Sequence, residues 1–218
     1  MPLTESFGVF LTKIRKRLQS QTVDIFTLNR VYLMAVTEMI KAYGYEEAMK
    51  RVFEWGYIMG HAYLLRLEKD VEKFSHNEIT TRLIGRTAWY IFSGTDPEVI
   101  VEKHDFFGKE ALLLIVRDRN SPWDKEFTIG KKIAYYPAGA YEGAANTFTL
   151  IVEKGRIKCF SRNTKSLSAG DECTEIVTIY VPKEATKEQI EKVFPGFLND
   201  IVSYEMSEEL YKRVVSPE

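Results

Sequence analysis

The sequence has few cysteines and no excess of charge of either sign. Only Cys159 and Cys173 occur among 218 residues, and 30 Lys and Arg stand against 31 Asp and Glu, a formal net charge of −1. Two cysteines are too few for the disulfide framework of a small secreted domain, which favours an intracellular setting. The balanced charge argues against a broadly basic nucleic-acid-binding protein, so we expect no nucleic-acid partner.

Long hydrophobic runs and targeting segments are also missing. The purest apolar run covers residues 111–116, far short of the roughly 20 residues that a membrane-spanning helix needs. Residues 1–5 have neither the basic region nor the apolar region of a signal peptide. We therefore expect a cytoplasmic protein with no membrane span.

The common motifs of catalysis and cofactor binding are absent. The sequence has no phosphate-binding loop, no dinucleotide-binding glycine turn after a strand, no nucleophile elbow, no Cys-x-x-Cys and no His-Glu-x-x-His. Three scattered histidines remain: His61 on a helix, His76 expected to be exposed, and His104 at a strand end. No nucleophile, base and oxyanion site can be assembled from these residues, so we expect neither an enzyme nor a cofactor.

Aromatic residues, by contrast, are abundant, with 13 Phe, 12 Tyr and 3 Trp. These rings must fill a core, a pocket or an interface. Hydrophobic residues make up 45% and charged residues 28% of the chain, which is the composition of a globular protein.

Apolar residues at helical spacing predict helices throughout the first half of the chain. We expect them at about residues 4–19, 24–43 and 45–67, and from a capping box at Ser75 and Glu78 to Gly94. In the first helix, Lys13, Arg15, Lys16 and Arg17 form either a patch for anionic lipid or nucleic acid, or an ordinary solvated face.

The helix at residues 45–67 is the most informative. Gly56 and Gly60 lie four residues apart on its main apolar face. Because glycine weakens a helix interior, close packing against another backbone is the expected compensation. Trp55, Ile58 and Ala62 form a second apolar strip, which predicts burial on two sides, within the fold or across a dimer.

The second half changes character. Strands are expected near residues 99–101, 111–116, 156–160 and 174–181, with a turn at 104–108, a helix at 137–152 and a hairpin turn at 166–171. Strands that neighbour one another predict an α+β fold: N-terminal helices packed on a small twisted antiparallel sheet of two hairpins with an intervening helix. We predict one domain, residues 1–218, with a helical half (1–95), a sheet region (96–182) and a C-terminal helical extension (183–218).

Several short motifs resemble the 4-vinyl-reductase domain family. They are Gly139-Ala140-Tyr141-Glu142-Gly143 before a helix, Gly155-Arg156 before a strand, and Gly170-Asp171-Glu172-Cys173 before another strand. The helix with Gly56 and Gly60 is similar to the family's upstream glycine helix, so the resemblance covers roughly residues 45–182. Its superfamily includes haem nitric-oxide sensors and vesicle-tethering TRAPP subunits. The resemblance implies helices against a twisted antiparallel sheet, an apolar ligand cavity and frequent dimerisation.

The sequence departs from the zinc-binding sensors of that superfamily, which use three cysteines and a glutamate. Alignment on the family glycines places Ala134, Arg162 and Lys165 at three ligand positions, and only Cys173 remains. One thiolate cannot make a tetrahedral zinc site, so we expect no zinc in the second hairpin. Cross-strand packing must then hold the hairpin, with a Cys159–Cys173 disulfide as an open alternative. Haem has no support beyond His61.

The leading hypothesis is a non-enzymatic domain that binds a small apolar or aromatic ligand, in a sensing or carrier role, as a homodimer. The aromatic excess and the implied helix–sheet gap support this hypothesis. The candidate lining residues are Trp89, His104, Phe107, Trp123, Tyr136 and Tyr141. The alternative is a scaffold for protein–protein contact that resembles the TRAPP subunits and binds no ligand.

Overall fold

The computed structural model describes residues 25–215, and the side chains of residues 30–214. The helix predicted at residues 4–19 lies outside this part of the chain. The described elements are α2 (Ile25–Tyr43), α3 (Tyr45–Leu65), α4 (Glu68–Val71), α5 (Glu78–Ser93), β1 (Glu98–Phe106), β2 (Lys109–Asp118), α6 (Tyr135–Glu153), β3 (Ile157–Lys165), the 3-10 turn η1 (Leu167–Ala169), β4 (Thr174–Pro182), α7 (Lys187–Val193) and α8 (Tyr204–Val215).

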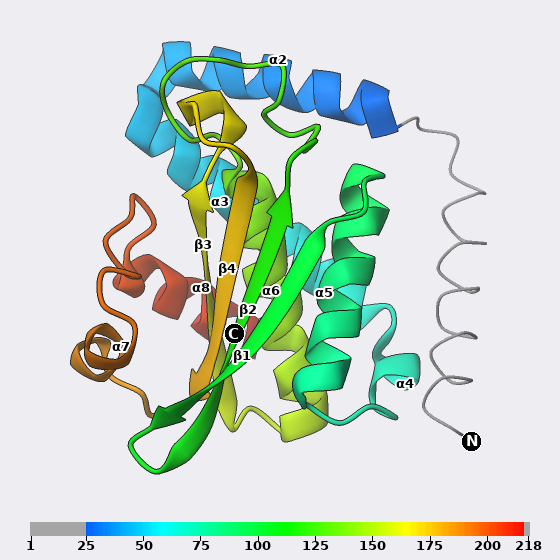
Figure 1. Cartoon of the computed structure of the whole chain (residues 1–218), viewed down its shortest axis with the longest axis vertical. Helices are drawn as coiled ribbons and strands as arrows, with labels where there is room; N and C mark the ends of the chain where they lie inside the picture. The colour runs from blue at the N-terminus through cyan, green and yellow to red at the C-terminus, as the bar shows by residue number, and fades with distance from the viewer. Residues whose placement is uncertain (1–24, 216–218) are drawn as a thin grey trace.

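The four strands form one antiparallel sheet in the order β1-β2-β4-β3. Each outer pair is a hairpin, and the hairpins join through β2 and β4, with α6 between them in the chain (Figure 1). Strand β4 is buried at every position except its last. This burial on both faces requires cover on both sides of the sheet. The predicted α+β architecture is confirmed.

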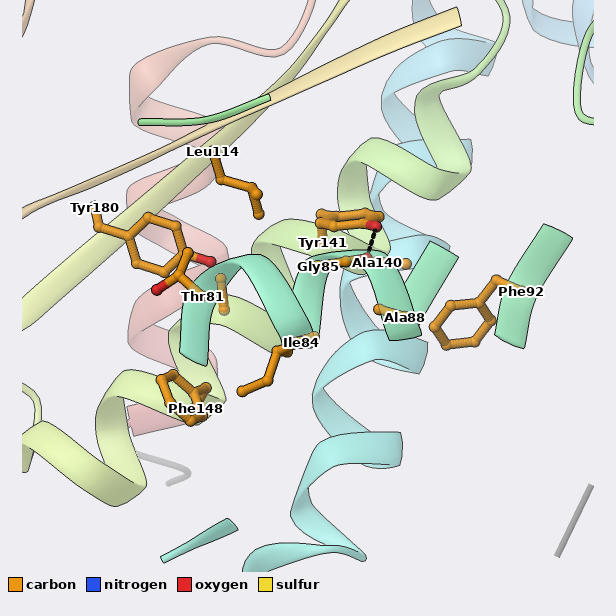
Figure 2. Close-up of a pocket in the computed structure, with 12 residues that line it drawn as sticks. Thr81, Ile84, Gly85, Ala88, Phe92, Leu114, Ala140, Tyr141, Phe148 and Tyr180 are labelled. Carbon is orange, nitrogen blue, oxygen red and sulfur yellow. Dashed lines mark hydrogen bonds between the residues drawn. The ribbon is translucent and has the colours of Figure 1, made fainter. Parts of the chain in front are cut away.

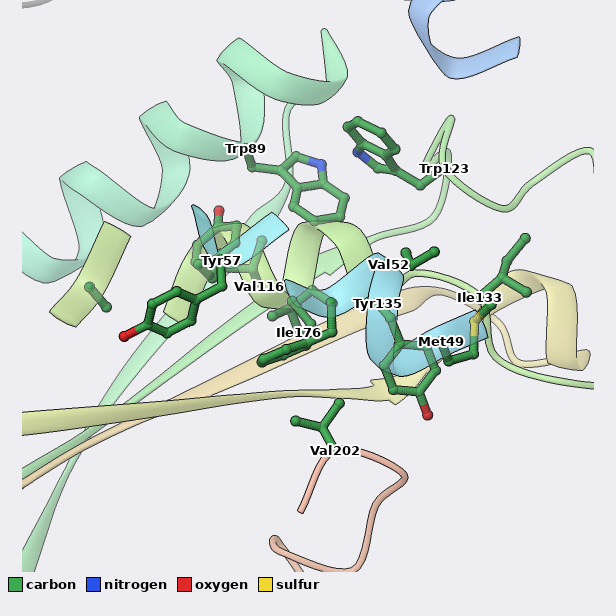
Figure 3. Packing of buried hydrophobic residues seen from close by; sticks show 14 of the residues in the cluster. Met49, Val52, Tyr57, Trp89, Val116, Trp123, Ile133, Tyr135, Ile176 and Val202 are labelled. Carbon is green, nitrogen blue, oxygen red and sulfur yellow. The ribbon is translucent and has the colours of Figure 1, made fainter. Parts of the chain in front are cut away.

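Helices α5 and α6 pack on one face of the sheet, and α3 packs against α6 (Figure 1). The main core lies in this layer, where Trp89, Val116 and Ile176 meet residues of α3 (Figure 3). A second apolar cluster lies on the opposite face under α7 and the segment that follows it. Its buried members are Phe106, Ala111, Phe160, Ile179, Val181, Ala185, Ile190, Phe194 and Leu198.

Helices α3 and α6 cross with their backbones in contact. A Cβ atom built on Gly60 would lie 2.1 Å from the carbonyl oxygen of Ala140, and one on Gly143 would lie 2.0 Å from that of Tyr57. Gly56 and Gly139 make equivalent approaches at 2.1 and 2.0 Å. The close packing predicted for the glycine helix is therefore confirmed, and glycines of α6 complete it from the other side.

Side chains of α6 cover the outer edge of β3. Asn146 forms two hydrogen bonds with the backbone of Cys159: its amide donates to the carbonyl at 3.0 Å, and its oxygen accepts from the N–H at 2.9 Å. Glu142 accepts the Ser161 N–H at 2.7 Å. An exposed edge strand can recruit a second chain, and these bonds prevent this at β3.

A buried carboxylate bonds residues of the second hairpin, the one formed by β3 and β4, in which we expect no zinc. Asp124 is fully buried and accepts hydrogen bonds from the hydroxyls of Ser166 and Thr174, both at 2.5 Å. Burial raises the pKa of Asp124, and these hydroxyls partly offset the rise. Cys159 and Cys173 are both free and buried, so the open disulfide alternative is excluded here.

The first hairpin differs from its sequence prediction. Strand β1 continues through His104 to Phe106, so residues 104–106 are not a turn. The turn is only Phe107 and Gly108, whose φ angles of 55° and 81° are the left-handed values of a two-residue hairpin turn. Strand pairing outweighs the local turn signal of Asp105 and Gly108.

The start of α5 also differs from its prediction. Asn77, rather than Ser75, is the N-cap, because its side-chain oxygen accepts the Thr80 N–H at 3.0 Å. The expectation that His76 is exposed is wrong. Its ring lies 5.0 Å from the ring of Tyr180 and 6.2 Å from that of Phe148, measured between centroids.

Candidate ligand pocket

A pocket opens between α5, α6 and the sheet (Figure 2). Its cavity volume is about 30 Å³, and it is open to solvent on one side. Its described lining residues carry no charge; they are Thr81, Ile84, Gly85, Ala88, Phe92, Leu114, Ala140, Tyr141, Ala144, Ala145, Phe148 and Tyr180.

Small residues keep the two helices from filling the gap between them. Gly85 and Ala88 of α5 face Ala140, Ala144 and Ala145 of α6 across the pocket. Larger rings stand at the ends, Phe92 near one and Phe148 near the other (Figure 2). Ile84, Ala88, Phe92 and Ala144 are only partly buried, so the pocket opens between α5 and α6.

One hydrogen bond ties the pocket walls together. The Tyr141 hydroxyl of α6 donates to the Gly85 carbonyl of α5 at 2.5 Å, drawn as a dashed line in Figure 2. Burial raises the pKa of Tyr141 and of Tyr180 well above the ordinary tyrosine value. Both phenols therefore stay neutral and protonated near neutral pH, and the described lining offers polar contacts without an ionised group.

The structure places two of the six predicted lining residues at or next to this pocket. Tyr141 lines it, and the ring of Trp89 lies 6.2 Å from that of Tyr141, between centroids. The Trp89 indole donates to Asp118 at 2.7 Å, which fixes the ring in the core. Trp89 is therefore one ring away from any ligand in the pocket.

The other four predicted residues lie elsewhere, so the six do not converge on one cavity. Trp123 and Tyr136 pack together, with ring centroids 5.3 Å apart, and Tyr32 lies 5.2 Å from Trp123. They fill the core near α2. His104 packs on the ring of Phe194 at 5.1 Å in the α7 layer, and Phe107 is half-exposed on the hairpin turn. Both positions arise because β1 continues to Phe106, which places His104 within the strand and Phe107 in the turn.

The pocket residues that sequence analysis missed are mostly small. Gly85 and Ala88 on one helix, and Ala140, Ala144 and Ala145 on another, recur at helical spacing. Two helix faces of small residues, each ending in Phe, could have indicated a gap between helices. The aromatic excess pointed to large rings instead, and most of those are core.

A buried ion pair lies away from the pocket, between α6 and β3. Arg162 donates to Glu142 at 3.1 Å, and both side chains are at most 1% exposed. Burial raises the pKa of Glu142, and the Arg162 charge opposes that rise. Arg162, which aligns with a zinc-ligand position, thus forms an ion pair with a carboxylate.

Within residues 25–215, no three His, Cys, Asp or Glu side chains form a metal-binding group. The absence of zinc from the second hairpin stays a prediction.

Comparisons with known proteins support the fold alone. No protein-family model and no curated protein matches the chain. Among solved structures, trafficking protein particle complex subunit 3 from Naegleria fowleri, covalently bound to palmitic acid, is similar at 18% identity with a TM-score of 0.50, over 75% of this chain and 97% of that one.

A second similar structure is the phenol-responsive sensory domain of the transcription activator PoxR with phenol. It has 13% identity and a TM-score of 0.50, over 78% of this chain and 80% of that one. The chain therefore shares its fold with a TRAPP subunit and with a phenol-responsive sensory domain.

Among the described helices, none has the length and hydropathy of a transmembrane segment.

Proposed function

We propose that the chain is a non-enzymatic binding domain for a small apolar or aromatic ligand, related to the 4-vinyl-reductase domains, with a sensing or carrier role in the cytoplasm. The observation that carries this proposal is the uncharged pocket between α5 and α6. Its described lining contains no histidine, cysteine or acid that could act as a nucleophile or base. The phenol sensor with a similar fold supports a binding role.

The pocket favours a ligand of about one ring that binds without a covalent bond. Apolar cavities of roughly 150 Å³ hold benzene, whereas the cavity here is about 30 Å³, so a ring fits only when the open side of the pocket widens. The half-buried Ile84 and Phe92 lie on the open side and can adjust. Neither cysteine of the chain lines the pocket, so an acyl group attached to cysteine has no anchor there.

Ligand binding can be measured by calorimetry and by the fluorescence of Trp89, which is one ring from the pocket. We expect single-ring hydrocarbons and phenols to bind and to change the emission. Ala88→Phe fills the pocket from α5 and should abolish binding. Ala42→Leu, on the exposed end of α2, is the control and should bind normally. If no compound of a broad panel binds, or if Ala88→Phe binds normally, the proposed function is wrong.

A separate observation supports the homodimer of the leading hypothesis. Trp55 and Ile58 of the second apolar strip, and the adjacent Met59, are each about half-exposed. The described residues therefore leave this face of α3 uncovered; these three residues are called the α3 strip. We propose that this strip is the interface of a homodimer. The dimer is compatible with ligand binding, because none of these three residues lines the pocket.

A further inference from the structure

The pocket contains a buried hydroxyl group with no partner. Thr81 of α5 is 2% exposed, lines the pocket, and its Oγ1 forms no hydrogen bond with any described residue. A threonine in a helix usually bonds the carbonyl one turn earlier. Since a buried, unpaired hydroxyl is costly, a group that enters the pocket and bonds it recovers that cost.

Two further polar side chains, Tyr180 and His76, lie close to Thr81 or to one another, whereas the hydroxyl of Tyr141 is already bonded to the Gly85 carbonyl. Figure 2 shows Thr81 and the Tyr180 ring together at the end where Phe148 lies. The ring of His76 packs against that of Tyr180, with centroids 5.0 Å apart, and its Nε2 is also buried without a partner among the described residues. At the opposite end, Ala88 and Phe92 offer only carbon atoms (Figure 2).

From this polarity we infer that the ligand is a neutral molecule with an apolar body and one hydrogen-bonding group, a hydroxyl or a carbonyl. The hydrogen-bonding group meets the hydroxyl of Thr81, and the apolar body extends toward Ala88 and Phe92. A hydroxyl both donates and accepts, so Thr81 serves either group. A carboxylate is disfavoured, because no described lining residue carries the positive charge that a buried anion requires.

This inference rests on the proposed function and makes it more specific. Three ligands of similar shape test it: 4-ethylphenol, ethylbenzene and 4-ethylbenzoate. Calorimetry on the full chain should show that 4-ethylphenol binds about 3- to 10-fold more tightly than ethylbenzene, the effect of one neutral hydrogen bond. Binding of 4-ethylbenzoate should be weaker than that of either.

Thr81→Val keeps the shape of the side chain and removes its hydroxyl. It should abolish the preference for 4-ethylphenol and leave ethylbenzene binding unchanged. Thr80→Val is a matched control: Thr80 is its neighbour on α5, is also 2% exposed with an unpaired Oγ1, and does not line the pocket. This variant should keep the preference.

Two results would overturn the inference while leaving the proposed function intact. One is equal binding of the phenol and the hydrocarbon by the unmodified chain. The other is a Thr81→Val variant that keeps the preference, or loses affinity for all compounds equally. If none of the three compounds binds, the proposed function itself fails, and the inference fails with it.

Discussion

At the scale of single residues, the buried ring of His76 contributes to how the stability of this protein depends on pH. The ring of His76 contacts those of Tyr180 and Phe148, and its Nε2 is buried. Burial lowers the pKa of His76 below its ordinary value of 6.5. The unfolded chain therefore binds this proton more readily than the folded chain does.

We expect His76 to weaken the fold in mild acid. The stability that neutral His76 contributes is fully present above pH 6.5. It is lost as pH falls through the lowered pKa of His76 in the folded state. Urea unfolding at pH 7.5 and pH 5.0 should show a smaller loss of stability for His76→Gln than for the unmodified chain. Buried Asp124 and Glu142 have raised pKa values and act in the opposite direction, but both sequences contain them. An equal loss in the two proteins would exclude His76 as the source.

Single residues also show what the sequence can and cannot predict. Gly56 and Gly60 indicate close helix packing, because glycine inside a helix needs a compensating contact. This inference needs only the sequence of the one helix. The environment of Thr81 or His76 depends on Tyr180, about a hundred residues later in the chain. No local pattern records such a contact.

At the scale of elements, the crossing of α3 and α6 is the rigid centre to which the rest of the fold attaches. Its four glycines place backbone against backbone, so no side chain can move aside to make room. Interiors packed this closely resist added atoms. We therefore expect one methyl group at this crossing to be far more damaging than one elsewhere.

A pair of identical substitutions tests that expectation. Gly60→Ala places a Cβ 2.1 Å from the Ala140 carbonyl oxygen and should cost about 3 kcal/mol or more of unfolding free energy. Gly85→Ala meets only Leu114 methyl groups at 3.0 and 3.1 Å, and should change stability by at most about 1 kcal/mol, since alanine also favours the helix. Denaturant midpoints measure both. Similar losses in the two variants would show that the crossing is not the rigid point.

The strands were harder to predict than the helices. In β1 only Val101 and Phe106 are buried, so this edge strand has little hydrophobic alternation for a sequence pattern to reveal. The central strands β2 and β4 are apolar, and the sequence predicts β4 to within one residue and β2 to within two residues at each end. Pairing with a neighbour defines the ends of β1 and its turn, and pairing is not visible in a single segment.

At the scale of the whole molecule, the protein combines a pocket with a helix face that the described residues leave uncovered. The pocket lies between α5 and α6, while the half-exposed Trp55, Ile58 and Met59 lie on α3. Large contiguous apolar patches on a protein surface are typical of interaction sites. This separation allows one chain to bind a ligand and a second copy together, as a sensing dimer requires.

The proposed dimer makes the final prediction. Sedimentation at tens of micromolar, a range set by ordinary interface affinities, should give twice the chain mass of 25.2 kDa. Ile58→Glu places a charge in the centre of the α3 strip, where its burial would be unfavourable, and should yield monomers. Ile79→Glu is the matched control, because Ile79 is 66% exposed on α5 and lies outside the strip; it should sediment as the unmodified chain does. A monomeric unmodified chain would leave the α3 strip to another partner, and a dimer that persists in Ile58→Glu would place the interface on a different face.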